Sequence, residues 1–373
     1  MTKQRPPRAI SSMCLSSAAR NVRWRFPKPR APSLAASRSE RFGQQIERAT
    51  ATSHRSSTAR KRAGAAVMTW EPALIVLCTF VVMALCGVVV TAGLLMSRPV
   101  QNDVGPAPPV LAGAEAVRIP SRSGTVLSGW WINGEPGGGC IVLMHGVRRN
   151  RLTMARRAEL LHGWGFSVLL FDFQAHGASP GRSITFGYLE ALDANAAISF
   201  ARHRLPAERL GVIGVSLGGA AALLGPAPPQ VDALVLESVF PDLRSALINR
   251  LHIYLGPVWG KALAPILAPM FRLLMWAVLG VRSATLRPID HIAGVTAPVL
   301  IASGTRDRST TIEEARTLFH HATEPKQFWA VEGAGHVNLE RFNPAAYWRV
   351  VLPFITQYVQ SEIQPVANQS VGT

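Results

Sequence analysis

Cysteine is scarce in this chain, with four residues among 373. Cys14 lies in an Arg- and Ser-rich segment, Cys78 and Cys86 lie in a long apolar run, and Cys140 opens a short apolar segment. This placement gives no evidence of a disulfide framework. No group of His, Cys, Asp and Glu has the spacing of a metal site. We therefore expect neither a metal ion nor a cofactor.

Acidic residues are almost absent from the first 70 positions, where only Glu40 and Glu47 oppose 15 Lys and Arg. These positions carry a net charge of 15 − 2 = +13 out of the +17 of the whole chain, which leaves +4 for the other 303 residues. The strong positive charge therefore belongs to the N-terminal tail. It excludes a generally basic, nucleic-acid-binding body, and we expect no nucleic-acid partner.

Residues 1–67 also lack any sustained apolar period, so they cannot bury enough surface to offset the entropy of ordering. We predict that this tail is disordered, and we predict the same for residues 361–373. A transit peptide and a basic arm that contacts anionic lipid or nucleic acid are both compatible with the tail. A third alternative is that the protein starts at Met68, which opens the sequence MTWEPALIVLC.

Charged side chains are missing altogether from residues 73–96. As a helix this run would be about 36 Å long, enough to cross a hydrocarbon layer of about 30 Å. No convincing cleavage site follows it, which favours an uncleaved signal-anchor and makes the bilayer a partner. The Lys/Arg excess before the run predicts a cytoplasmic tail and an extracytoplasmic C-terminal part. A start at Met68 would remove most of that orientation signal.

Residues 97–112 form a Pro-rich, semi-rigid spacer, and residues 113–360 form one domain. Short apolar runs alternate there with helical stretches, which predicts an α/β fold with a mostly parallel sheet covered on both faces. The expected strands are 116–120, 126–132, 140–144, 167–171, 210–215, 233–236, 299–302 and 327–331, the first two forming a hairpin. The expected helices include 152–163, 188–203 and 344–359.

The most informative stretch is LGVIGVSLGGAAALL, residues 210–224. An apolar run meets Gly214-Val215-Ser216-Leu217-Gly218 and continues into an Ala/Leu-rich segment, the pattern of strand, sharp turn and helix. A serine that projects from such a turn can act as a nucleophile, and the glycines keep Cβ atoms away from it. The alternative is a Gly-rich turn whose serine only caps the helix. The pentapeptide by itself is a weak signal.

Candidate partners for Ser216 follow two later strands. His336 lies in a Gly-rich loop after residues 327–331, and Asp307 lies just beyond residues 299–302. Since parallel strands end at one edge of a sheet, these groups can form a Ser-His-Asp triad. Asp307 could instead cap the helix that carries Glu313 and Glu314. Glu237 is the second choice for the acid.

An oxyanion hole needs two backbone donors. The N–H of Leu217 is the first candidate, and the N–H of Val147, in the loop after residues 140–144, is the second. His145 and His176, each followed by Gly, are expected to order loops, and Asp172 to brace one.

Several motifs together resemble the α/β-hydrolase superfamily: HG after residues 140–144, DFQAHGASPG, GVSLGG, LESVFPD, RPIDHI, APVLIASGTRD and VEGAGHVNL. Over residues 114–360 the chain is similar to the serine aminopeptidase S33-like and lysophospholipase-like members. The resemblance implies an α/β-hydrolase fold and a serine hydrolase, with Ser216, Asp307 and His336 on the triad positions. One departure is Gln174-Ala175, where the family usually has Arg-Gly.

The insertion at about residues 241–287 occupies the place of the family's cap and is rich in Leu, Met, Trp and Phe. It is either a mobile lid over an apolar pocket or plain helix packing on the sheet. We predict a membrane-anchored, single-pass serine hydrolase acting on carboxylic esters, with a small-molecule ester or a lipid such as a lysophospholipid as substrate. Amide, peptide or thioester cleavage remains an alternative, as does a non-catalytic binding module. The sequence leaves the oligomeric state and the substrate open.

Overall fold

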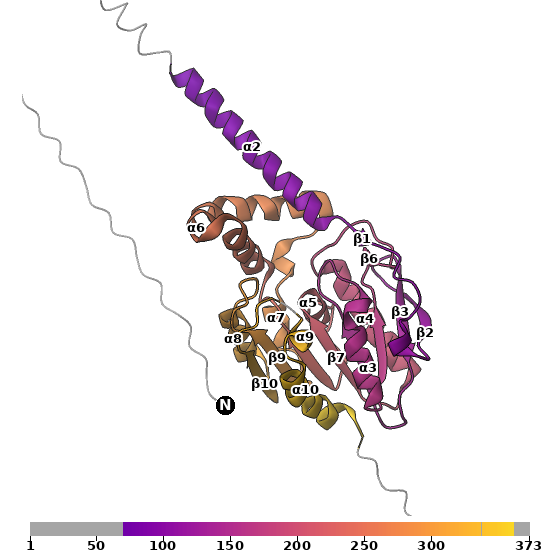
Figure 1. Cartoon of the computed structure of the whole chain (residues 1–373). Helices are drawn as coiled ribbons and strands as arrows, with labels where there is room; N and C mark the ends of the chain where they lie inside the picture. Colours follow the sequence, from indigo (N-terminus) through magenta and orange to yellow (C-terminus); the bar gives the residue numbers. More distant parts are fainter. Residues whose placement is uncertain (1–69, 337, 362–373) are drawn as a thin grey trace, which may run out of the picture. The chain divides into compact units, whose positions relative to one another are not determined.

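In the computed structural model, residues 70–336 and 338–361 are described (Figure 1). The chain divides into two compact units, residues 1–77 and residues 78–373. Of the first unit, only residues 70–77 are described, and they include the start of helix α2 (Glu71–Ser97). The predicted disordered tail and the segment after Ser361 lie outside the described residues.

Helix α2 contains the whole of the predicted membrane span, and most of its apolar side chains are exposed; Phe80, for example, is 72% exposed. By length and composition alone, two described helices could cross a membrane, namely α2 and α6 (Leu243–Leu279). A single span was predicted from the sequence, because the apolar run at residues 270–279 of the insertion is too short to cross a membrane. The structure therefore supplies two candidate spans.

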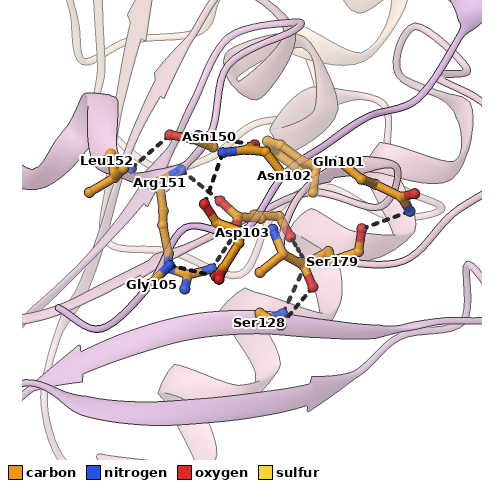
Figure 2. Close-up of polar contacts among 12 residues, drawn as sticks. Gln101, Asn102, Asp103, Gly105, Ser128, Asn150, Arg151, Leu152 and Ser179 are labelled. Atoms are coloured by element: carbon orange, nitrogen blue, oxygen red, sulfur yellow. Dashed lines mark hydrogen bonds and ion pairs between the residues drawn. The ribbon is translucent and has the colours of Figure 1, made fainter.

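The Pro-rich segment after α2 packs on the C-terminal domain. Strand β1 (Val100–Gln101) pairs in parallel with β6 (His176–Gly177), and the 3₁₀-helix η1 (Pro109–Leu111) buries Leu111. Figure 2 shows Gln101 Nε2 donating to the Ser179 carbonyl at 3.2 Å, and Asn150 bonded to Asn102. A segment expected to be only a spacer is thus hydrogen-bonded to the loops that follow two strands.

The central sheet has eight strands in the order β10-β9-β8-β7-β4-β5-β3-β2. All neighbours pair in parallel except β3, which is antiparallel to both β2 and β5, so the predicted hairpin is present. The strands are β2 (Glu115–Pro120), β3 (Val126–Ile132), β4 (Cys140–Met144), β5 (Ser167–Phe171), β7 (Leu210–Val215), β8 (Ala233–Glu237), β9 (Val299–Gly304) and β10 (Lys326–Val331). Their ends lie within two residues of the predicted ones.

Helices cover both faces of this sheet (Figure 1). Alternate strand residues such as Val142 and Val212 pack with α4 (Tyr188–Arg204), α5 (Leu217–Leu223) and α8 (Ile312–His321). Their neighbours Ile141 and Ile213 pack with α3 (Ala155–Gly163) and α10 (Pro344–Val359). A strand buried on both faces needs a nearly continuous apolar sequence, as CIVLM and SVLLF provide. The predicted α/β fold is confirmed.

The insertion is built around α6, which follows Asp242, the N-cap residue whose carboxylate accepts the Ser245 N–H. Gly256 has φ +78° and interrupts the helix just before Pro257, because proline cannot continue the helical hydrogen bonds. The short elements η3 (Ser283–Thr285) and α7 (Pro288–Ile292) lead to β9, while η2 (Arg151–Met154) precedes α3 and α9 (Leu339–Phe342) precedes α10.

The first turn of α5 lies directly against strand β4. A Cβ atom added to Gly218 would lie 2.4 Å from the Met144 carbonyl oxygen and 2.7 Å from its carbonyl carbon. Only a residue without a side chain allows this approach, and the approach sets the position of the turn at Ser216.

We predict that Gly218→Ala destabilises the domain by about 1–3 kcal/mol, because neither backbone can move without disturbing the sheet. Gly163→Ala, at the end of α3, is the matched control, since nothing lies within 4 Å of its added Cβ. The control should be neutral or slightly stabilising. Thermal unfolding of the full chain in detergent measures both, and equal melting temperatures for the two variants would contradict the prediction.

Candidate active site

Ser216 stands at the sharp turn between β7 and α5. Its backbone has φ +50° and ψ −111°, a conformation that L-residues rarely adopt and that is found at functional turns. Its N–H donates to the Glu237 carbonyl at 2.7 Å, which ties the turn to β8. The serine is 7% exposed, so its hydroxyl is largely withdrawn from water while still lining a cavity.

The structure brings the three predicted side chains together. Ser216 Oγ lies 3.3 Å from His336 Nε2, and His336 Nδ1 lies 2.8 Å from Asp307 Oδ2. The Asp307 carboxylate is fully buried, whereas the His336 side chain is 27% exposed. With Nδ1–H donating to Asp307, Nε2 is left to accept the serine proton. The hydroxyl, imidazole and carboxylate therefore form one continuous hydrogen-bonded chain.

Backbone hydrogen bonds join the loops that carry Asp307 and His336. The N–H of Arg306 donates to the Ala334 carbonyl at 2.8 Å, and the N–H of Gly333 donates to Thr305 Oγ1 at 2.9 Å. These bonds continue the pairing of β9 with β10 past the ends of the strands. The separation of carboxylate and imidazole is therefore set by the sheet.

The second oxygen of Asp307 accepts the N–H groups of Ser309 and Thr310, at 2.8 and 2.9 Å. It does not cap helix α8, because that helix begins with Thr311 and Glu314 in a reciprocal capping box. The alternative of Asp307 as a helix cap is wrong, and its carboxylate is free to orient His336.

Val147 and Leu217, the two expected oxyanion donors, belong to segments next to Ser216. Val147 follows β4 and lines the same cavity as Ser216, and Leu217 is the first residue of α5. A Cβ added to the neighbouring Gly146 would lie 3.7 Å from Ser216 Cβ, so this loop passes close to the nucleophile. Within the described part of the chain, neither amide N–H has a hydrogen-bond acceptor.

His145 and His176 order the loops at the ends of β4 and β5. His145 Nδ1 donates to the Gly146 carbonyl at 2.8 Å, and its Nε2 accepts the Phe173 N–H at 3.2 Å. Burial, and to a smaller extent the neighbouring His176, lower the pKa of His145 to about 3. His176 Nε2 in turn accepts the Arg148 N–H at 3.1 Å. Both rings have structural partners on both nitrogens.

Asp172 braces the same region. Its carboxylate accepts the Arg151 N–H at 2.7 Å and the Ala178 N–H at 2.9 Å, and it forms a buried ion pair with the Arg151 guanidinium. A Cβ at Gly177 would fall 2.4 Å from the Asp172 carboxyl carbon, so the following loop wraps tightly around this side chain.

Gln174, where the family usually has Arg, has contacts of its own. Its Nε2 donates to Glu190 Oε1 at 2.8 Å and to the Ser183 carbonyl at 2.7 Å, while its N–H donates to Asp193. Burial raises the pKa of Asp193 to about 6. A neutral amide therefore braces this loop in place of a guanidinium.

Glu237, the second choice for the acid, is bound elsewhere. Its carboxylate accepts Tyr347 Oη–H at 2.6 Å and Arg157 Nη2–H at 2.7 Å, and it is fully buried. Burial raises the pKa of Tyr347 well above its usual value. The alternative of Glu237 as the acid that orients His336 is wrong, because Arg157 and Tyr347 bind its carboxylate and Asp307 accepts from His336 Nδ1. The Glu237 network instead holds α3 and α10 to β8.

A cavity of about 950 Å³ opens at Ser216 and His336. No sequence pattern pointed to Ser238, whose backbone also has a positive φ of +51° and whose buried hydroxyl has no hydrogen-bond partner among the described residues. Nor did any pattern point to the cationic lining of the cavity, formed by Arg149, Arg156, Arg157, Arg250 and Arg341. The only sequence signal for Ser238 was its place right after β8, and the arginines come from distant segments.

Comparisons with known proteins agree with this architecture. Residues 136–278 match the family model described as serine aminopeptidase, S33. The uncharacterized protein Rv2307c of Mycobacterium tuberculosis is 31% identical over 269 residues, which cover 70% of this chain and 86% of that protein. The α/β hydrolase domain-containing protein WAV2 of Arabidopsis thaliana is 27% identical over 259 residues, covering 65% and 79%.

Among solved structures, the Pyrococcus furiosus esterase Pf2001 superposes with a TM-score of 0.58 at 24% identity, covering 71% of this chain and 98% of that one. The α/β hydrolase GrgF from a Penicillium species gives 0.52 at 19%, covering 66% and 99%. Fold and site together define a protein of the hydrolase type. The chain belongs to the α/β-hydrolase superfamily.

The buried His145 predicts a pH dependence of stability. Because its pKa is depressed in the folded state, the unfolded chain binds an extra proton between about pH 6.5 and about pH 3. Stability is therefore lost as the pH falls through this window, with a slope of up to about 1.4 kcal/mol per pH unit. His145→Gln should flatten this slope, whereas changing the exposed His203 to Gln should not. Urea unfolding of the full chain between pH 7 and pH 4 measures it, and parallel slopes for wild type and His145→Gln would refute the assignment.

Proposed function

We propose that this protein is a membrane-anchored serine hydrolase that cleaves carboxylic esters through an acyl-enzyme on Ser216. The observation that carries the proposal is the relay from Ser216 Oγ to His336 Nε2 at 3.3 Å and from His336 Nδ1 to Asp307 at 2.8 Å. Ser216 and His336 line a cavity of about 950 Å³, which is large enough for an ester with a sizeable acyl chain.

In the first half-reaction, His336 Nε2 takes the Ser216 hydroxyl proton as Oγ forms a bond to the ester carbonyl carbon. The tetrahedral intermediate collapses when its C–O bond to the leaving alcohol breaks, and His336 gives the proton to that alcohol. Water then attacks the acyl-enzyme, losing a proton to His336, and the proton returns to Ser216 as the acid is released. Asp307 orients the ring and stabilises its cationic form.

The oxyanion that forms in each half-reaction needs donors already in place. Among the residues that the structure describes, the N–H groups of Val147 and Leu217 have no acceptor, Val147 lines the same cavity as Ser216, and Leu217 lies at the N-terminal end of α5. We assign them this role, since preorganised amides stabilise developing negative charge with little reorganisation. The mechanism requires no metal or cofactor.

Esters are the favoured substrates because the relay matches acyl transfer to a serine and because one solved neighbour is named an esterase. Amide, peptide or thioester hydrolysis uses the same residues and remains the alternative. A non-catalytic binding module would not need a strained serine aligned with a histidine that a buried aspartate orients.

Labelling with a fluorophosphonate tests this proposal directly. We expect the full chain in detergent to be labelled at Ser216 and to lose labelling completely in Ser216→Ala. Asp307→Asn should slow ester hydrolysis by about 10⁴-fold, because the ring then loses its correct tautomer.

Ser309→Ala is the matched control beside Asp307, since it keeps the backbone N–H that Asp307 accepts. It should retain most of the activity. Labelling that persists in Ser216→Ala, or full activity in Asp307→Asn, would exclude the proposed mechanism.

We further propose that α2 is the membrane anchor and that the domain that follows it lies on the extracytoplasmic side. Residues 73–96 of α2 carry no charged side chain and most of their apolar side chains are exposed, which supports the span. From Val89 onward α2 packs against α6, where a Cβ at Gly93 would meet Leu274 Cδ2 at 2.3 Å. Tyr254, Trp259 and Trp276 of α6 are exposed, which would place an apolar helix next to the bilayer surface.

Native and introduced thiols test this orientation in intact cells. We expect a membrane-impermeant maleimide to label Arg349→Cys, on the exposed surface of α10, without permeabilisation. Cys14, in the basic tail, should react only after permeabilisation, with Cys14→Ser as the control. The reverse pattern would place the domain in the cytoplasm, and release of the protein by alkaline carbonate would exclude a spanning anchor.

A further inference from the structure

We propose that the cavity selects esters that carry an anionic group, a carboxylate or a phosphate, and that Arg149, Arg250 and Arg341 bind this group. The inference rests on the proposed function and deepens it, because it names the charge of the substrate. It does not depend on where the membrane lies.

The charge balance of the cavity carries the argument. Among its described lining residues, the one carboxylate is Glu340, which is buried and accepts Arg156 Nε–H at 3.0 Å. A fifth lining guanidinium, that of Arg157, is committed to Glu237 at 2.7 Å. In each of these two ion pairs the carboxylate neutralises its arginine. The other three arginines of the lining therefore determine the net charge of the cavity.

None of these three arginines forms an ion pair with the residues that the structure describes. Arg149 comes from the loop after β4, Arg250 from α6 and Arg341 from α9. Arg250 donates to the Ser309 carbonyl at 3.3 Å, which holds α6 to the loop that follows Asp307. Three elements far apart in the sequence thus direct uncompensated positive charge to the cavity that contains the nucleophile.

An exposed arginine alone means little, and Arg149 and Arg341 are exposed. Convergence on one cavity with no free carboxylate is what points to an anionic ligand. A guanidinium presents a planar fork of N–H groups that matches carboxylate and phosphate oxygens, and it retains its charge at every physiological pH. Positive charge in a concave site also attracts anions more strongly than the same charge on a flat surface.

Apolar side chains also line this cavity, namely those of Leu152, Met154, Val215 and Phe342. A cavity lined by both apolar and cationic groups fits an amphiphile, an ester that carries a hydrocarbon part and a negative group. The geometry favours neither the acyl part nor the alcohol part as the carrier of the charge, so both arrangements are tested.

Two pairs of substrates separate the effect of a negative charge on the substrate from that of acyl-chain length. p-Nitrophenyl valerate and the mono-p-nitrophenyl ester of glutaric acid have acyl chains of equal length and differ by a terminal carboxylate. 1-Oleoylglycerol and 1-oleoylglycerol 3-phosphate share their acyl ester and differ by a phosphate. We expect the full chain in neutral detergent to have at least about tenfold higher kcat/KM for the anionic member of one pair or both. The preference should shrink as salt is raised, because screening weakens the attraction.

Substitutions then show which arginines bind the anionic group of the substrate. Arg149→Gln, Arg250→Gln and Arg341→Gln should each lower the ratio of anionic to neutral kcat/KM by about tenfold, chiefly through KM. Arg341→Lys should lose less than Arg341→Gln, because the charge remains and the planar fork is lost. Arg349→Gln, an exposed residue of α10 that does not line the cavity, makes the same change in net charge and should leave the ratio unchanged.

The outcomes separate this inference from the function on which it rests. If no ester is hydrolysed in a Ser216-dependent way, the proposed function fails. If hydrolysis depends on Ser216 but the neutral member of both pairs is preferred, or if the arginine variants leave the ratio unchanged, this inference alone is overturned. The pair that shows the preference identifies the anion as carboxylate or phosphate.

Discussion

The contact between the start of α5 and strand β4 is the constraint on which the rest of the site depends. Gly218 lies against the Met144 carbonyl, closer than any side chain would allow, and this contact holds Ser216 at its strained backbone angles. The strain is tolerated because β7 lies between β4 and β8 and is buried on both faces. A serine in a freer loop would relax and lose its alignment with His336.

The parallel sheet serves the same purpose for the other groups. β4, β7, β9 and β10 are parallel and end at the same edge of the sheet. The short loops that follow these strands carry Val147, Ser216, Asp307 and His336, and the sheet itself therefore brings these residues together. Buried polar residues beneath and beside this edge stabilise it in turn. The Arg157–Glu237–Tyr347 network holds α3 and α10 to β8, and Asp172 holds the loop after β5. The carboxylates of Glu237 and Asp172 are paired in these contacts and take no part in the hydrogen-bonded relay of Ser216, His336 and Asp307.

Much of this arrangement could be predicted from local patterns. Fully buried strands such as CIVLM and LGVIGV are unbroken apolar runs, and the Gly-rich loops at Ser216 and His336 mark the turns that follow them. The wrong predictions concerned residues whose partners are distant. Glu237 stands at the end of β8, much as Asp307 follows β9, but Arg157 and Tyr347 bind its carboxylate. These two residues lie 80 and 110 positions away in the sequence. The pairing of residues 100–101 with 176–177 likewise could not be predicted, because a strand of two residues is too short to show the alternating pattern of apolar and polar residues.

The sequence by itself determined the order of strands and helices along the chain, the long helix α2 with its charge-free residues 73–96, and the three candidate triad residues. Each of these follows from residues close together in the chain. Only the tertiary structure decided which carboxylate orients His336, that the Pro-rich segment packs on the domain, and that five arginines line one cavity with a single, already paired carboxylate. The reason is physical. Secondary structure depends on local periodicity, whereas ion pairing and the charge of a cavity depend on which distant segments the sheet brings to the same edge.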